Sequence, residues 1–360
     1  MIYTSEFVAP GHPDKVADII VSYILDRYLE RDRNVRFALE CQIKDNFVTL
    51  GGEVTSTFKP TDEDLKGFVR EAVCLIGYTP EYYKKWGEGN CIDPDALDVT
   101  IHIGMQSPDI AQGVDQEGWG DQGIMWGMAV YSPETDYMPL DHYIAKMLGM
   151  HLYTLSRDGV ADFGLDIKTQ VTVDDGKVTE VVVAAPVKTT DALRRLHGEV
   201  EAFLVKEFCV YPGTYELTVN GTGAYVRHAS QGDCGTTGRK LAVDFYGGNC
   251  RIGGGCPWGK DPSKADVTLN IYARELAKNW VEQSGGISKT IYCAINCCIG
   301  QKKIGIVYFD GHLRQVCISM EDRPASKVIE EMGLREPVWA CKAMNGLFCQ
   351  SRKGEAVRSF

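Results

Sequence analysis

The sequence lacks the features that mark membrane-spanning, secreted and general nucleic-acid-binding proteins. No stretch of its 360 residues approaches the roughly 18 consecutive apolar residues that span a membrane. Its first residues, MIYTSEFVAPGHPDK, have neither the positively charged start nor the apolar run of a signal peptide. We therefore expect a cytoplasmic protein without a membrane partner. The formal net charge of -11 argues against the broad basic face that nucleic acids require, so any phosphate site must be local.

The 13 cysteines include no CxxC pair and no cluster with histidine. Cys293, Cys297 and Cys298 lie in an apolar, strand-like run, ISKTIYCAINCCIG. We interpret the cysteines as reduced and buried small hydrophobic residues, and a metal or redox site is the alternative. A hydrophobic content of 44% over this length allows two or three compact units.

Hydrophobic periodicity predicts helices that alternate with paired strands. We expect helices over 14–30, 65–77, 141–157, 190–208 and 267–283. We expect a hairpin with the turn DDGK at 174–177, and strands over 36–43, 47–57, 98–104, 215–220, 240–246, 287–300 and 304–311. Three rounds of helix plus paired strands indicate an α+β fold of related units, although no residue-level repeat is visible.

The stretch GHPDK, residues 11–15, stands at the predicted start of the first helix. Unpaired N–H groups and a partial positive charge make a helix start an anion site, to which His12 and Lys15 would add donors. Asp14 would repel a phosphate directly, which makes sense if Mg²⁺ lies between them. The alternative is an ordinary capped helix, in which Asp14 interacts favourably with the helix dipole.

Two glycine-rich stretches present further cations. Residues 253–266, GGGCPWGKDPSKAD, satisfy GxxxxGK, but Asp261 stands where a Walker loop needs Ser or Thr, which argues against such a loop. Residues 232–240, GDCGTTGRK, place Arg239 and Lys240 side by side. Taken singly, either stretch could equally be a surface turn with solvated charges. Together with GHPDK in an acidic chain, they indicate a polyphosphate clamp assembled from distant segments.

The order of these motifs carries a resemblance to a known family. The full set is GHPDK, GGEVT (51–55), IGMQSPDIAQGV (103–114), GDQG (120–123), ETDYMP (134–139), DIKTQVTV (166–173), GDCGTTGRK and GGGCPWGKDPSKAD. The sequence resembles the methionine adenosyltransferases, also called S-adenosylmethionine synthetases, in which these motifs occur in the same order. One motif could match by chance, whereas eight in register hardly could.

The resemblance implies the fold and the assembly. We expect an α+β protein of three similar α/β-sandwich domains around a pseudo-threefold axis. We place an N-terminal domain at 1–104, a central domain at 105–228 and a C-terminal domain at 229–360, interleaved in space. The family implies a homodimer with active sites at the subunit interface, and a homotetramer is the larger alternative.

The resemblance also implies the reaction, in which the methionine sulfur attacks C5′ of ATP. The whole tripolyphosphate leaves and is then hydrolysed in the same site to pyrophosphate and phosphate. A thioether is a neutral nucleophile that needs no general base, so the main barrier lies in alignment and in the charge that builds on the leaving group. Cations should therefore dominate the site, as they do in these motifs.

The residues that the resemblance places at the leaving tripolyphosphate are cations and acids. His12 would donate a hydrogen bond to the oxygen that leaves C5′. The phosphates would be held by Lys168, Arg239, Lys240 and Lys260. The resemblance assigns two Mg²⁺ ions to Asp14 and Asp266, and a K⁺ ion to Glu40.

Further residues are assigned to the two substrates. ATP would contact His12, Asp166, Lys168, Tyr225, Asp233, Arg239, Lys240, Cys256 and Lys260. A methionine zwitterion needs partners of both signs, which would be Glu53, Gln106, Asp121, Asp233 and Lys264. Tyr225 takes a usual Phe position and keeps a flat ring for stacking on adenine, and core packing is the alternative for this residue alone.

Several positions depart from the family pattern. Only four residues, QEGW, separate QGVD from GDQG, so we expect a shorter gating loop that closes less completely. Ala224 replaces a usual Arg, and residues 228–230 replace a small glycine turn. Cys256, Pro257 and Trp258 alter the glycine loop, and the last part of the chain matches poorly.

These departures support two other hypotheses. The chain could be a non-catalytic relative that binds nucleotide or regulates a partner, although every acid and base assigned above is present. It could also be another ATP-dependent ligase or kinase with the same clamp, which would leave AMP or ADP as product. Methionine adenosyltransferase chemistry leaves no adenosine phosphate from the ATP that is turned over.

Overall fold

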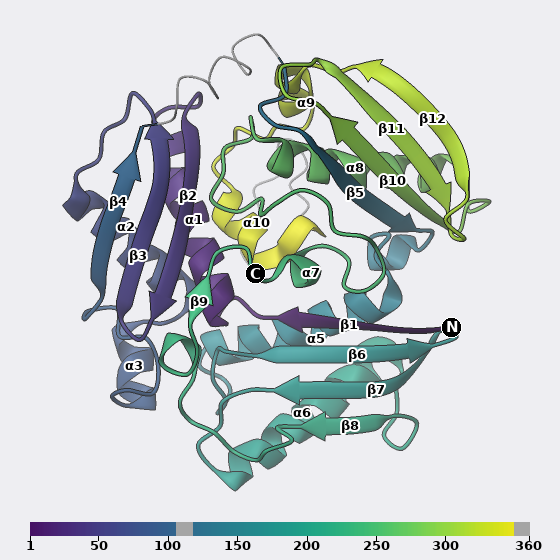
Figure 1. The fold of residues 1–360 in the computed structure, drawn as a ribbon. Coiled ribbons are helices and arrows are strands. Elements are labelled where there is room, and N and C mark those ends of the chain that lie inside the picture. The colour runs from purple at the N-terminus through teal and green to yellow at the C-terminus, as the bar shows by residue number, and fades with distance from the viewer. Residues whose placement is uncertain (106–117, 349–360) are drawn as a thin grey trace.

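In the described residues, three four-stranded sheets form the framework of the protein (Figure 1). The structure is a computed structural model that describes residues 1–105 and 118–348. The first sheet has the order β1-β6-β7-β8, with β1 at Ile2–Val8, β6 at Lys168–Asp174, β7 at Lys177–Ala184 and β8 at Glu216–Val219. The second has the order β12-β11-β10-β5, with β5 at Gly123–Val130, β10 at Thr290–Cys297, β11 at Lys303–Asp310 and β12 at Gln315–Asp322. The third has the order β4-β3-β2-β9, with β2 at Arg36–Lys44, β3 at Phe47–Thr55, β4 at Asp98–Gly104 and β9 at Gly235–Thr236.

Each sheet contains one strand from a distant part of the chain. β1 pairs antiparallel with β6, which places Val8 beside Lys168. β5 pairs with β10, and β9 pairs with β2, where Gln42 faces Thr236. The sheets are therefore interleaved along the sequence, and the division of the chain into domains at residues 104 and 228 stays a prediction.

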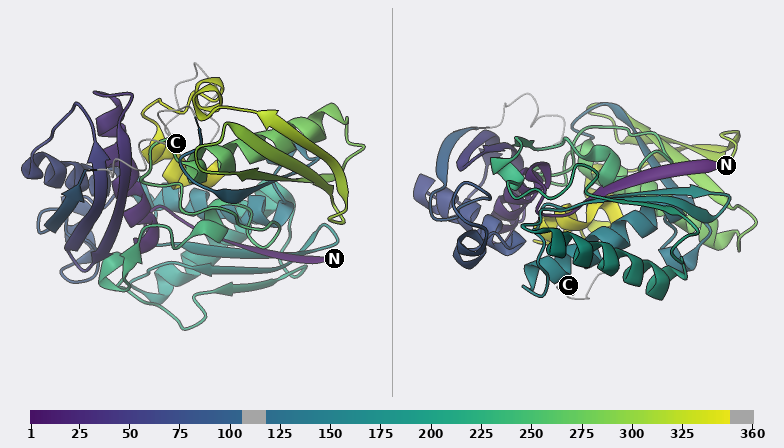
Figure 2. Two further views of the ribbon diagram at one scale, coloured as in Figure 1. Left: turned by 45° about the horizontal axis from the view of Figure 1, so that its top comes forward. Right: turned by 90° about the horizontal axis from the view of Figure 1, so that it is seen from below.

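Helices cover the sheets and fill the space between them. They are α1 (Pro13–Leu29), α2 (Asp62–Ile76), α3 (Pro80–Trp86), α5 (Leu140–Arg157), α6 (Thr190–Phe208), α7 (Leu241–Asp244), α8 (Ala265–Gln283), α9 (Ala325–Glu331) and α10 (Trp339–Asn345). Short 3₁₀ turns are η1 (Pro133–Thr135), η2 (Ala229–Gln231) and η3 (Gly346–Phe348). α8 packs on β5 and β10, α5 packs on β1 and β6, and α1 packs on β2. In Figures 1 and 2, α10 lies at the centre, among the three sheets.

Most elements predicted from periodicity are confirmed, with bounds that differ by a few residues. The DDGK turn joins β6 to β7, where Asp175 and Gly176 have φ of 46° and 80°, as a type I′ hairpin turn requires. The strand predicted over 240–246 is wrong, because this segment forms the short helix α7. The amides of Asp244 and Phe245 donate to the carbonyls four residues earlier, and Asp244 turns inward to meet a buried lysine.

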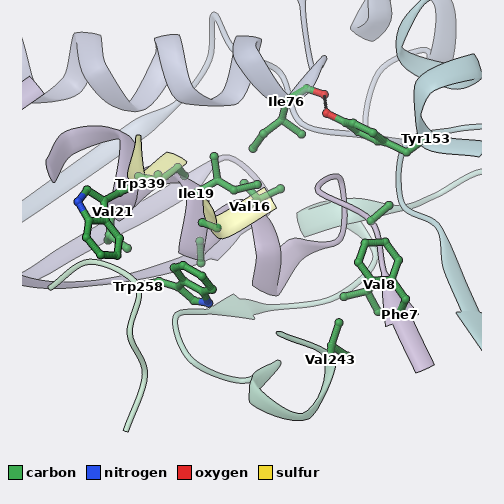
Figure 3. Packing of buried hydrophobic residues seen from close by; sticks show 14 of the residues in the cluster. Phe7, Val8, Val16, Ile19, Val21, Ile76, Tyr153, Val243, Trp258 and Trp339 are labelled. Carbon is green, nitrogen blue, oxygen red and sulfur yellow. Dashed lines mark hydrogen bonds between the residues drawn. The ribbon is translucent and has the colours of Figure 1, made fainter. Parts of the chain in front are cut away.

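One hydrophobic core joins the layers (Figure 3). Val16, Ile19 and Val21 of α1 are fully buried, and α1 contributes to this core along most of its length. Trp258 and Trp339 are brought to this helix from segments far along the chain. α1 is therefore the element around which the later segments pack.

Cysteine usage agrees in part with the sequence analysis. The twelve cysteines in the described residues are all free, and these residues hold no cluster of His, Cys, Asp or Glu suited to a metal ion. Cys41, Cys91 and Cys293 are buried as predicted, whereas Cys209 and Cys298 are exposed. No helix in residues 1–105 and 118–348 has the length and hydropathy to cross a membrane.

A buried histidine borders a second, smaller apolar cluster. His142 of α5 is fully buried beside Phe348, and neither of its ring nitrogens has a hydrogen-bond partner among the described residues. Burial lowers the pKa of His142 to about 3, and the charges of Lys146 and Arg274 add to this effect. The ring is therefore neutral at physiological pH and contributes no hydrogen bond.

We predict that His142→Leu stabilises the protein more at about pH 5 than at about pH 8. Because the pKa in the folded state lies below the ordinary value, only the unfolded chain gains a proton between these values, so His142 destabilises the fold as the pH falls through about 6.5. The lost stability is about 2 kcal/mol at pH 5. Urea unfolding midpoints at both pH values test this, with His312→Leu in an exposed turn as the control. An equal gain at both pH values would contradict the assignment.

Candidate active site

The start of α1 is packed into the interior by its first residues. A side chain on Gly11 would place Cβ 2.4 Å from the Leu165 carbonyl oxygen, and the hydroxyl of Tyr78 donates to the Gly11 carbonyl at 2.6 Å. His12 is the N-cap residue, and Pro13 is the first helical residue, one position before the predicted start of the helix. The side chains of His12 and Asp14 are almost completely buried.

His12 is held as a neutral donor. Its Nδ1 accepts the Asp14 amide at 3.2 Å, so the ring proton lies on Nε2. Burial, together with the neighbouring charges of Lys168 and Lys240, lowers the pKa of His12 to about 2. Lys15 and Arg239 act in the same direction. A neutral imidazole surrounded by four cations can donate through Nε2 without itself becoming charged.

Asp14 brings two of these cations to the helix start. Its Oδ2 accepts from Lys240 Nζ at 2.5 Å, and Arg239 Nη1 lies 3.6 Å from its Oδ1. The amide of Thr236 donates to Oδ1 at 2.9 Å. A side chain on Gly235 would collide with the Pro13 carbonyl, so this glycine allows the loop 232–240 to lie against the helix start. Two of the motifs are thereby brought together.

Asp166 stands two residues before Lys168, the first residue of β6. Its Oδ2 accepts the Ala229 amide at 2.9 Å. Burial raises the pKa of Asp166 to about 6, against the lowering effect of this hydrogen bond and of Lys168, while Asp233 and Asp14 raise it further. Burial and the charge of Asp166 also raise the pKa of Tyr225. Asp166, Tyr225 and Asp233 therefore adjoin the cations around His12.

The glycine loop forms a second group. Lys260 Nζ lies 2.6 Å from Asp266 Oδ2, and the Gly255 amide donates to Asp266 Oδ1 at 2.7 Å. Asp266 is in the first turn of α8, and Lys260 forms a bridge with Ala38 of β2. Lys260 and Asp266 thus form an ion pair between the glycine loop and the start of α8, and their assignment to phosphate and Mg²⁺ stays a prediction.

Cys256 connects this loop to the loop 232–240 by packing. A side chain on Gly238 would place Cβ 2.9 Å from Cys256 Cβ. The Cys256 thiol accepts a hydrogen bond from the Trp258 amide at 3.4 Å. Burial raises the pKa of this thiol well above its ordinary value. Cys256 is therefore an inert packing residue in this structure, and its predicted contact with ATP stays a prediction.

Four of the residues predicted to bind methionine and K⁺ form no ion pair with Asp14 or Asp266 in the described structure, whereas Asp233 acts on the charge of Asp166. Glu40 and Glu53 are exposed on β2 and β3, on the same face of their sheet. Lys264 precedes α8, and Asp121 is exposed, with its carbonyl accepting from the Cys297 thiol. Within the described residues, no hydrogen bond or ion pair joins them to His12. Gln106 and most of the gating loop lie outside the described residues.

Lys15 corrects the sequence analysis. We expected it to offer a donor at the anion site, but its ammonium group is buried and points inward. Lys15 Nζ donates to both oxygens of Asp244 at 2.7 and 2.8 Å, and to Asp18 Oδ2 at 3.2 Å. Sequence reasoning missed Asp18 and Asp244, although the spacing of Lys15 and Asp18 is that of a helical ion pair.

A hydrogen-bond chain through His228 fixes the surroundings of Asp166. His228 Nδ1 lies 2.6 Å from the Val226 carbonyl oxygen, which can only accept, so Nδ1 carries the proton. Nε2 must then accept from the hydroxyl of Tyr82 at 2.9 Å, and this hydroxyl accepts the Leu165 amide. Burial lowers the pKa of His228 to about 4, so the ring stays neutral. Leu165 precedes Asp166 in the chain, and His228 precedes Ala229. The hydrogen-bond chain therefore holds the residues next to the contact between Asp166 and the Ala229 amide.

Comparisons with known proteins identify the family of this chain. Sequence models of S-adenosylmethionine synthetase match in three parts, the N-terminal domain over residues 1–108, the central domain over 116–225 and the C-terminal domain over 228–356. The chain belongs to the S-adenosylmethionine synthetase family. The resemblance stated from the motifs is thereby confirmed.

Relatives in this family are similar over nearly the whole chain. The S-adenosylmethionine synthase of Wolinella succinogenes is 36% identical over 372 residues, which cover 96% of this chain and 92% of that protein. That of Nitratiruptor is 38% identical over 347 residues, which cover 92% and 83%. A solved structure described as an unusual S-adenosylmethionine synthetase from Campylobacter jejuni has a TM-score of 0.87 at 31% identity and covers 97% of this chain and 95% of its own. The predicted α+β architecture of three sandwich domains is confirmed.

We predict that Tyr82→Phe lowers the free energy of unfolding of this member of the synthetase family by about 2 kcal/mol or more. The change leaves His228 Nε2 and the Leu165 amide without partners, and each unpartnered buried group costs about 1–3 kcal/mol. Tyr215→Phe is the matched control, because the buried hydroxyl of Tyr215 has no partner in the described structure. Denaturant titration of both variants gives the comparison. Equal losses in the two variants would show that the hydrogen-bond chain contributes nothing.

Proposed function

We propose that the protein synthesises S-adenosylmethionine from ATP and L-methionine. The methionine sulfur forms a bond to C5′ of ATP while the C5′–O bond breaks, and the tripolyphosphate leaves with the electron pair. Hydrolysis of the bound tripolyphosphate to pyrophosphate and phosphate then follows in the same site. The observation that carries the proposal is the buried, neutral His12 surrounded by Lys168, Arg239 and Lys240.

The surroundings of His12 suit a leaving group that gains negative charge. Preorganised donors stabilise such charge because they need not reorient as the reaction proceeds. The Nε2–H of His12 would donate to the oxygen that leaves C5′. Lys168, Arg239 and Lys240 would hold the phosphates from the same side, and Lys260 would join them. Asp166 and Tyr225 would contact the adenosine, since they adjoin this group.

The two acids predicted to bind Mg²⁺ fit that ion. Mg²⁺ commonly takes one or two carboxylates and completes its shell with substrate phosphates and water. Asp14 lies beside Lys240, and Asp266 lies beside Lys260, so each carboxylate stands next to a cation that would face the same phosphates. Bound Mg²⁺ would neutralise charge on the tripolyphosphate. Glu40, exposed on β2, would help bind K⁺.

A second subunit would complete the site. The contacts of the described residues form two groups, one around His12 and one around Lys260, while Glu53 stands on an exposed sheet face. We propose a homodimer in which such faces meet and in which methionine is held by Glu53, Gln106, Asp121, Asp233 and Lys264. A homotetramer built from two dimers is the larger alternative.

An exposed apolar sheet face supports this assembly. α8 covers one face of the sheet β12-β11-β10-β5, and the other face carries Ile124, Ile318 and Met320, which are 56%, 61% and 67% exposed. The register places these three side chains on the same face, beside the stacked rings of Trp126 and Phe309. Contiguous exposed apolar surface of this kind is typical of subunit interfaces.

Product analysis tests the reaction. The purified protein with ATP, L-methionine, Mg²⁺ and K⁺ should give S-adenosylmethionine, pyrophosphate and phosphate in equal amounts, measured by mass spectrometry and phosphorus NMR. AMP or ADP would indicate another ATP-dependent enzyme. Binding of ATP without turnover would indicate a non-catalytic relative.

We predict that Asp14→Asn lowers kcat by about 100-fold or more, with a much smaller change in thermal stability. The loss is of the size found when one preorganised charge partner is removed from a reacting centre. The control is Asp136→Asn, since Asp136 lies 3.0 Å from Lys278 in an ion pair that includes none of the residues assigned to the site. Turnover and melting temperature are measured for both. A parallel loss of turnover and stability in Asp14→Asn would reject the metal role.

The dimer has its own test. We predict that a charge on the apolar face, as in Ile318→Glu, converts the dimer into a monomer and lowers turnover by about 10-fold or more, because the burial of an unpaired charge opposes association. Sedimentation velocity gives the mass. Ile287→Glu, at a residue that is 91% exposed in another loop, is the control. A monomeric wild-type protein with full activity would overturn the dimer proposal.

A further inference from the structure

Four buried side chains form a polar cluster beneath the candidate site. Lys15, Asp18, Asp244 and Trp258 are each at most 2% exposed. Asp244 accepts from Lys15 Nζ on both oxygens and from Trp258 Nε1 at 2.7 Å. Lys15 Nζ also lies 5.1 Å from the centre of the Trp258 ring. The indole therefore contacts both members of the central ion pair.

Asp18 extends the cluster to a third segment. Its Oδ2 accepts from Lys15, and its Oδ1 accepts the Gly238 amide at 2.9 Å. Burial raises the pKa of Asp18 and of Asp244, while the two carboxylates together raise the pKa of Lys15 although burial alone would lower it. A buried charge costs little only when its hydrogen bonds are satisfied, so each of these contacts depends on the others.

Each hydrogen bond of the cluster includes a residue that stands within two positions of a candidate site residue. Lys15 follows Asp14 in the chain, and Gly238 precedes Arg239 and Lys240. Trp258 stands two residues before Lys260. The cluster thus connects the helix start, the loop 232–240 and the glycine loop, although none of its members is placed at the reacting atoms.

We propose that Trp258 is a positioning residue, which fixes Asp244 through its indole N–H and thereby holds the three cation-bearing segments in register. Trp258 belongs to the stretch of the glycine loop in which this chain departs from the family pattern. The effect on turnover rests on the proposed function, whereas the effect on the loop geometry does not.

The test compares two buried tryptophans. Trp258→Phe keeps an aromatic ring and removes the donor, whereas Trp339→Phe removes an indole N–H that has no partner in the described structure. In ligand-free protein, hydrogen exchange of the Gly238 amide should be faster by about 10-fold in Trp258→Phe, the scale of one lost hydrogen bond to a charged group, and unchanged in Trp339→Phe. Under turnover, kcat should fall by about 10-fold in Trp258→Phe with KM for methionine changed less than about 2-fold.

The outcomes separate the two proposals. Faster exchange at Gly238 with no turnover in the wild-type protein would overturn the proposed function and leave the role of Trp258 intact. The positioning role would be overturned if the wild-type protein turns over normally and the two variants, Trp258→Phe and Trp339→Phe, have the same Gly238 exchange rate and the same kcat. If Trp258→Phe does not fold, Asp244→Asn keeps the volume and one acceptor and removes the charge. The proposal then requires the same faster exchange at Gly238 in that variant, and unchanged exchange would reject it.

Discussion

The ammonium group of Lys15 is the charge around which the rest of the site is arranged. This ammonium group is buried, so its charge must be balanced by carboxylates. Asp244 and Asp18 both form ion pairs with it. Asp244 belongs to α7, more than two hundred residues along the chain, so this ion pair fixes the first turn of α1 against a late segment. A buried ion pair of this kind contributes little net stability but strongly disfavours any other arrangement of its partners.

The same constraint explains the short helix and the central position of the C-terminal segment. α7 turns Asp244 inward, and a side chain on Gly346 would place Cβ 2.7 Å from the Asp244 carbonyl oxygen. Asp26 of α1 accepts the amides of Trp339 and Ala340 at 2.8 and 2.9 Å, which caps α10. The last described residues therefore pack on the helix whose first turn carries His12 and Asp14.

The sequence predicted what local chemistry determines and missed what distant contacts determine. The helix at 190–208 and the DDGK turn follow from spacing and from turn residues, and both are present as α6 and the β6 to β7 hairpin. The run KLAVDFY has the apolar character of a strand, yet it forms α7, because Lys15 requires the carboxylate of Asp244. Nothing within GHPDK distinguishes Lys15, which points inward, from a surface donor. The sequence did indicate that GHPDK and the loop 232–240 belong together, because both present cations in an acidic chain, and the ion pair of Asp14 with Lys240 joins these two segments.

The charge distribution then explains how an acidic chain can bind a polyanion. The formal charge of -11 is spread over the molecule, whereas around His12 the nearest cations are Lys168, Arg239, Lys240 and Lys15. Lys15 is already neutralised by Asp18 and Asp244, and Asp14 is the acid that pairs with Lys240 and Arg239. Lys168, Arg239 and Lys240 are thus gathered at a buried helix start whose histidine is neutral. Under the proposed function, a tripolyphosphate would meet donors that the fold already holds in place, and bound Mg²⁺ would offset the repulsion between its phosphates and the nearby carboxylates.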